Sequence, residues 1–169
     1  MTQRSVAVYL MSFILPMAAL TAQTPDCPLH AEHMAQAAHE LDQRGDKVMG
    51  FEHMRTTHHF LAEPDGGVIQ VEANDAADAE SLAQIRQHLA HVAASFAKGD
   101  FSMPAEIHGR TLPGVPEMIR LKDAIHYRYE EIEKGARVRI STENPEARAA
   151  VHEFLKAQIG DHRTGDPTP

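Results

Sequence analysis

Apolar and polar residues alternate along two pairs of short segments in the central and C-terminal parts of the chain. The first pair, residues 57–63 and 68–73, flanks a Pro-Asp-Gly-Gly turn, and in the second segment apolar side chains alternate with Gln70 and Glu72. Alternation with a period of two is typical of a strand with one buried face. We therefore predict an antiparallel hairpin, with Ile69 and the residues of the same parity facing the core.

Helical spacing follows this hairpin. From a cap at Asn74 or Asp75 to about Lys98, apolar residues recur at intervals of three and four, and Gly99 follows as a stop signal. These apolar residues predict one buried stripe: Leu82, Ile85, Leu89, Val92 and Phe96.

The same order of elements recurs closer to the C-terminus. Residues 125–133 and 137–142 are predicted strands around a Lys-Gly-Ala turn. Asn144 followed by Pro145 is a typical start for a helix, which we expect to run to about Ile159. The recurrence is interpreted as a duplicated unit, with chance recurrence of a common motif as the alternative.

Two β-β-α units in tandem predict an α+β fold. The simplest packing is a four-stranded antiparallel sheet with two helices on one face. Between the units lies a connector, residues 100–116, which contains three prolines and is followed by a short predicted helix over residues 117–122.

Residues 1–22 have the pattern of a secretory signal peptide. Arg4 precedes the apolar run of residues 6–20, and cleavage is predicted near Ala22. A membrane anchor is the rival interpretation, but the run is shorter than the roughly 20 residues that a spanning helix needs, and Pro16 interrupts it. We therefore expect a periplasmic or secreted protein.

The remaining chain divides into three parts. Residues 23–55 are predicted to form a flexible arm that contains His and Met, with a short helix over residues 31–44 that Gly45 interrupts. Residues 56–163 form the β-β-α body, and residues 164–169 are expected to be a tail.

Composition narrows the possible chemistry. The chain has 24 acidic and 16 basic residues, a net charge of −8, which argues against nucleic acid as a partner. Its one cysteine excludes an internal disulfide, and Gly-rich phosphate loops, GxSxG and HExxH motifs are absent from the sequence. Histidine, with 12 residues, is the remaining signal, and imidazole is a good ligand for copper and zinc.

One group of candidate metal ligands lies in the arm. Cys27, His30 and His33 are spaced three residues apart, with Met34 and His39 nearby. The Cys-Pro-Leu-His stretch resembles the Cys-Pro-Met-His-Pro motif of heavy-metal-binding segments in bacterial metal-efflux proteins, although Leu replaces the Met and Ala the second Pro. A solvated arm whose histidines bind nothing is the alternative.

A second group lies in the body. His58 and His59 are adjacent on a strand and must point to opposite faces, whereas His88 and His91 are three residues apart on a helix and share a flank. We expect His58 or His59 to meet His88 and His91, with His108 as a fourth ligand. Three imidazoles with an open position would form an exchangeable metal site; the alternative is a polar helix edge.

The remaining body histidines have no partner at metal spacing. His126, His152 and His162 are therefore expected to be structural, and His162 to cap carbonyl groups at the end of the last helix.

Several longer stretches resemble a family of short exported bacterial proteins. They include the TTHHF segment at 56–60, GGVIQVEAN at 66–74, residues 85–101 with their two histidines, and residues 151–166. The resemblance covers most of the chain after the signal peptide and implies the same fold and export. It supplies no activity.

These observations favour an exported metal-binding protein that uses clustered histidines to bind, buffer or deliver copper or zinc. A module that binds a small ligand or a protein without metal is the alternative. A His-metal hydrolase or oxidase is less favoured, because only Glu52, Glu63 and Glu72 are candidate carboxylates near the histidines. A partner protein or a homodimer through the open sheet face is compatible with each.

Overall fold

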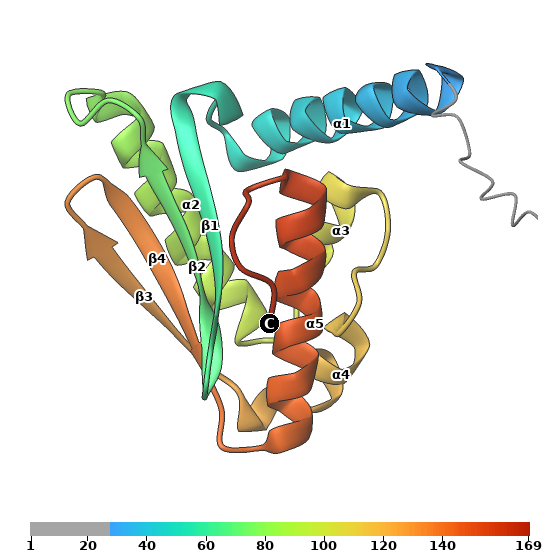
Figure 1. Ribbon diagram of the computed structural model, residues 1–169. Coiled ribbons are helices and arrows are strands. Elements are labelled where there is room, and N and C mark those ends of the chain that lie inside the picture. Colours follow the sequence, from blue (N-terminus) through green and yellow to red (C-terminus); the bar gives the residue numbers. More distant parts are fainter. Residues whose placement is uncertain (1–27) are drawn as a thin grey trace, which may run out of the picture.

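The computed structural model describes residues 28–169, with side chains from residue 32 onward, so the predicted signal peptide and Cys27 lie outside the described residues. Four strands form one antiparallel sheet in the order β1-β2-β4-β3 (Figure 1). The strand bounds are β1 (Thr56–Glu63), β2 (Gly66–Ala73), β3 (His126–Ile132) and β4 (Gly135–Ser141). The helices of the described residues are α1 (Pro28–Met49), α2 (Ala79–Phe96), α3 (Ser102–His108), α4 (Val115–Arg120) and α5 (Pro145–His162), with short 3-10 turns at His53–Arg55 and Lys122–Ala124.

The predicted α+β architecture is confirmed. Two β-hairpins, each followed by a long helix, join through antiparallel pairing of β2 with β4, in which Ile69 lies opposite Val138. Both helices cover the inner face of the sheet. Each helix packs mainly on the hairpin of the other unit: α2 lies on β4 and β3, whereas α5 lies on β1 and β2 (Figure 1).

The core lies between the inner face of the sheet and the helices. Strand alternation places Phe60, Ile69 and Val138 on this face, and each is at most 6% exposed. The largest buried side chains of α2 and α5 pack on them, as the predicted stripes require: Ile85, Leu89, Phe96, Phe154 and Leu155.

The helix caps follow local side-chain chemistry. Asn144 accepts hydrogen bonds from the backbone N–H groups of Glu146 and Ala147, which confirms the predicted start of α5. The predicted cap of α2 is wrong by a few residues, because Asp78, whose side chain accepts a hydrogen bond from the Ser81 N–H, caps the helix in place of Asn74 or Asp75.

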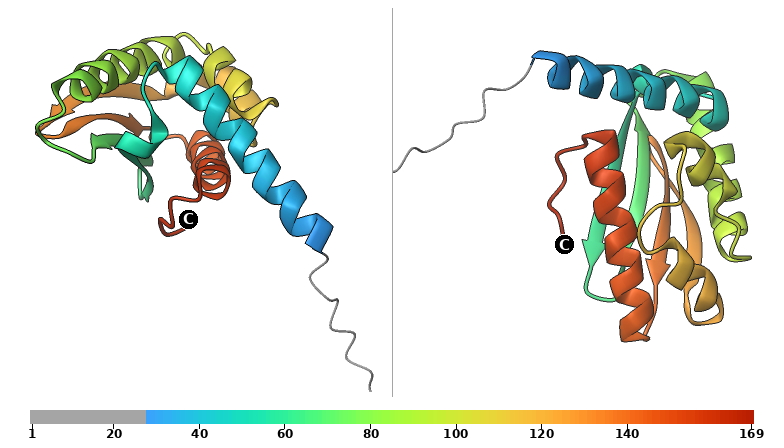
Figure 2. Two further views of the ribbon diagram at one scale, coloured as in Figure 1. Left: turned by 90° about the horizontal axis from the view of Figure 1, so that it is seen from above. Right: turned by 90° about the vertical axis from the view of Figure 1, so that its right-hand side faces the viewer.

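Helix α1 is longer than the short helix expected over residues 31–44. It continues through Gly45 to Met49, because its C-terminal half has a packing partner in α3: Leu41 and Met49 are both 8% exposed. A Cβ at Gly45 would lie 3.2 Å from the Met49 methyl carbon, so the absence of a side chain admits this packing. The N-terminal end of α1 extends beyond the rest of the molecule (Figure 2).

The C-terminal tail lies against β1. The Asp166 carboxylate accepts hydrogen bonds from the Phe60 backbone N–H and the Thr164 hydroxyl, at 2.9 and 2.6 Å, and lies 2.9 Å from Nδ1 of His59. The tail thereby satisfies a backbone donor at the free edge of the sheet. No helix within residues 28–169 combines the length and the apolar content that a membrane span requires.

Close packing of α5 on the first hairpin gives a test of this architecture. An added Cβ at Gly67 would lie 2.3 Å from Cδ1 of Leu155 and 2.6 Å from the carbonyl oxygen of Leu61. We expect Gly67→Ala to lower the free energy of unfolding by about 3 kcal/mol, since both neighbours must move. Gly160→Ala in α5 has open space around its Cβ and is the matched control, which should be neutral or stabilising by about 0.5–1 kcal/mol. Urea denaturation measures both, and an equal effect of the two changes would contradict the packing.

Candidate histidine cluster

The sequence pair His58-His59 divides between the two faces of β1, as strand geometry requires. His58 lies beside Phe60 on the inner face and pairs across the ladder with Val71. His59 lies on the outer face and contacts the Asp166 carboxylate of the tail. Only the first of the two therefore reaches the core.

Four histidines approach one another between the sheet and the helices, and we call them the interior cluster: His58 from β1, His88 from α2 and His162 from α5, which are half-buried, and His108 from α3, which is buried. All four line one cavity of about 50 Å³ between the sheet and the helices. The rest of its wall is apolar apart from Gln158, and includes Phe60 and the thioethers of Met49 and Met103. This volume is enough for a water molecule or a single ion.

Aromatic contacts hold the cluster together. The rings of His58 and His162 stack with centroids 5.6 Å apart and planes 10° apart. His108 meets His162 edge to face at 5.1 Å, and His88 meets Phe51 in the same way at 5.5 Å. Each ring of the cluster therefore packs against an aromatic side chain from a different segment of the chain.

Burial keeps the imidazoles neutral. Desolvation lowers the pKa of His58 and of His88 to about 4 and that of His162 to about 3, and the neighbouring rings lower these values further because two imidazolium ions would repel. At neutral pH each of these rings is uncharged, so each has a nitrogen lone pair available to accept a proton or a metal ion.

The four rings differ in their hydrogen bonding. The Nε2 atom of His58 is fully buried and has no hydrogen-bond partner among the described residues. In contrast, His108 is engaged at both nitrogens, since its Nδ1 lies 2.7 Å from the Asp161 carboxylate and its Nε2 lies 2.8 Å from the Gln158 amide. Burial lowers the pKa of His108 although the Asp161 carboxylate opposes the shift. His108 is therefore held in place by hydrogen bonds at both nitrogens, whereas the Nε2 atom of His58 is free to bind a ligand.

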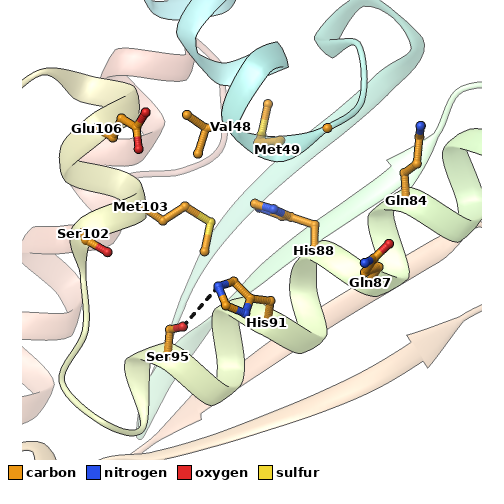
Figure 3. A pocket seen from close by; sticks show the side chains of 11 residues that line it. Val48, Met49, Gln84, Gln87, His88, His91, Ser95, Ser102, Met103 and Glu106 are labelled. Carbon is orange, nitrogen blue, oxygen red and sulfur yellow. Dashed lines mark hydrogen bonds between the residues drawn. The ribbon is translucent and has the colours of Figure 1, made fainter.

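A groove of about 590 Å³ lies outside the cavity, between the end of α1, helix α2 and helix α3 (Figure 3). His88, Met49 and Met103 line both the groove and the cavity. His91 lies on the groove side only and is exposed, with its Nε2 3.5 Å from the Ser95 hydroxyl. The two histidines of α2 thus share a flank, as expected, but only His88 reaches the core.

The remaining predicted ligands lie elsewhere. His33 is an exposed residue of α1, whereas Cys27 and the side chain of His30 lie outside the described residues. The structure therefore brings together His58, His88 and His108 and leaves His59 and His91 apart from them.

One member of the cluster, His162, was not predicted from the sequence. His162 was expected to cap helix-end carbonyls, but its ring lies against His58 in the core. Helical spacing places His162 near the buried stripe of α5, because it follows Ile159 by three residues and Leu155 by seven, but this spacing does not indicate its partner on β1. Met49 and Met103 gave no such signal, since both lie outside the regular patterns.

Two further findings bear on what the cluster can bind. Within residues 28–169, no group of three or more His, Cys, Asp or Glu side chains has the geometry to hold one metal ion. Comparisons of the chain with models of protein families, with curated proteins and with solved structures give no match. The binding chemistry must therefore be inferred from the cavity's own side chains, thioethers included.

The lowered pKa values make stability depend on pH. The unfolded chain, with imidazole pKa values of 6.5, binds more protons than the folded chain once the pH falls below that value. The free energy of unfolding is therefore unaffected by these histidines above about pH 6.5 and decreases as the pH falls towards 4. We expect the free energy of unfolding to drop by at least about 2 kcal/mol between pH 7.5 and pH 5. Urea denaturation at the two pH values measures this drop.

A variant separates the cluster from other titrating groups. His162→Phe retains a ring in the stack but removes one titrating group, so it should reduce the drop, whereas His126→Gln on an exposed position of β3 should leave it unchanged. A drop of equal size in all three proteins would contradict the assignment.

Proposed function

We propose that this protein is an exported metal-binding protein that takes copper or zinc into the interior cluster, for buffering or delivery. The observation that supports this most directly is the presence of three neutral imidazoles around one small cavity, one with an unpartnered Nε2. An unpaired buried polar atom costs roughly 1–3 kcal/mol. A ligand that engages the His58 nitrogen would offset that cost.

The metal would enter a site of fewer than three imidazoles, completed by other donors. His58 and His88 are the first candidates, because His108 is already engaged at both nitrogens and His162 stacks face to face on His58. Histidine binds metal through a neutral nitrogen, and the low pKa values of these rings keep that form populated well below neutral pH. Capture by Cys27, His30 and His33 of the N-terminal segment, before transfer to the body, remains part of the proposal.

Metal analysis tests this function. We expect the purified mature protein, after incubation with copper or zinc and desalting, to retain about one ion per chain, and the double variant His58→Phe, His88→Leu to retain none. His126→Gln is the matched control, because it removes an exposed imidazole outside the cluster. Retention by the double variant equal to that of the wild type would exclude the interior cluster as the site.

The pH dependence of retention gives a second readout. A solvent-exposed imidazole titrates near pH 6.5 and is mostly protonated at about pH 5.5. His58 and His88 have pKa values of about 4 and should still hold metal at that pH. Loss of all metal between about pH 7 and pH 6 would point to exposed ligands instead.

The groove supports the alternative function, a module that binds a small ligand without metal. Its volume of about 590 Å³ falls in the range of small-molecule sites, and glutamines of α2 and Glu106 of α3 supply polar groups to its wall.

Glu52, Glu63 and Glu72 line neither the groove nor the cavity, so the carboxylates considered for a hydrolase do not lie beside the cluster.

Export has its own test. We expect the mature protein in a periplasmic or secreted fraction to begin near Gln23, after cleavage of residues 1–22. Intact-mass spectrometry of the fractionated protein measures this. A full-length mass would overturn the proposed localisation without bearing on metal binding.

A further inference from the structure

Three side chains from three different helices stand in the wall between the groove and the cavity. Met49 comes from the C-terminal end of α1, His88 from α2 and Met103 from α3, and each lines both spaces. Figure 3 shows the His88 ring and the Met103 side chain pointing toward each other, with Met49 above the ring. Two thioethers and one imidazole therefore lie where the groove and the cavity adjoin.

These side chains form a donor set that favours one class of ion. Thioether sulfur is a soft ligand that selects cuprous copper over harder ions, and imidazole is also a suitable ligand for copper. Zinc normally takes thiolate or carboxylate ligands in addition to histidine. The described residues that line the cavity include neither, and the groove lining has one carboxylate, Glu106. Two carboxylates near the cluster are already engaged: Asp161 by His108 and Arg110, and Asp46 by His53.

Charge gives the same answer independently. The donors of the wall are all neutral, because the pKa of His88 is about 4. An ion held there by neutral ligands in a largely apolar wall keeps its full charge, and the Born cost of burying an ion rises with the square of that charge. The desolvation cost of a divalent ion is therefore about four times that of a monovalent ion of the same size. Cuprous copper satisfies both the softness and the charge requirement.

We propose that the protein binds a single cuprous ion between Met49, His88 and Met103, with the unpartnered Nε2 of His58 as the next donor on the cavity side. This inference rests on the proposed metal-binding function and specifies its ion and ligands. His91 and Glu106 lie on the groove side of this site, so an ion from solvent meets them first. The cavity contains no carboxylate in its wall that would hold a divalent ion.

Competition with a coloured cuprous chelator tests the proposal. The full mature protein is titrated into the chelator's copper(I) complex under reducing conditions, and zinc binding is measured in parallel with a zinc-sensitive dye. We expect Met49→Leu, Met103→Leu to weaken copper(I) binding at least about tenfold, the loss seen when even an outer partner of a metal ligand is removed. Its zinc binding should not change. Leucine conserves the side-chain volume, so the fold should persist.

Met54→Leu is the matched control, since Met54 is 76% exposed and lies outside the wall. Unchanged copper(I) binding in the double variant would overturn the thioether site. If the His58→Phe, His88→Leu variant still lost its metal in that case, the proposed function would stand. If the wild type bound neither ion, both proposals would fail.

X-ray absorption of the copper(I)-loaded protein gives a readout that does not depend on the methionine variants. We expect sulfur scattering in the first coordination shell, together with nitrogen from imidazole. Cys27 is the one cysteine of the sequence and could also supply sulfur. The measurement is therefore repeated on Cys27→Ser, in which any sulfur scattering comes from methionine. A first shell of nitrogen alone in Cys27→Ser would overturn the proposal, even if the methionine variants failed to fold.

Discussion

The burial of several uncharged imidazoles in a hydrophobic core is the constraint on which the other properties of this protein depend. Desolvation penalises the imidazolium form, and nearby histidines make that form still less favourable, so His58, His88 and His162 have pKa values of about 3 to 4. The same penalty has two effects. It keeps nitrogen lone pairs free at neutral pH, and it makes the fold sensitive to acid, because protonation is easier in the unfolded chain.

The topology explains how these rings meet. His58 belongs to the first hairpin and His162 to the last helix, and they stack because α5 lies on β1 and β2, the hairpin of the other unit. Had each helix covered its own hairpin, α5 would lie over β3 and β4, away from His58. His88 reaches the cavity from α2, and α3 supplies His108 from the connector. The exchange of helices between units therefore builds the cluster.

The sequence predicts the elements well and the cluster only in part. Alternation along β1 predicts that His58 and His59 point to opposite faces, and spacing on α2 predicts that His88 and His91 share a flank, but these patterns leave open which of each pair reaches the cavity. His162 was missed because no local spacing links it to a partner 104 positions earlier in the chain. The pairing of His108 with Asp161 and the packing of Met49 on α3 depend in the same way on contacts between distant segments.

The two β-β-α units differ at matching helix positions, and this difference supports the proposed binding role of the histidines. Helices α2 and α5 begin 66 residues apart, at Ala79 and Pro145, and at the same offset Phe154 of α5 matches His88 of α2. Phe154 is fully buried against Phe96 and Phe101, and shows that an aromatic ring fits this kind of position with no polar atom to satisfy. The first unit retains an imidazole there and another at His58 with an unpartnered nitrogen. A core optimised for stability alone would favour the apolar ring, and departures from that rule are expected at functional sites.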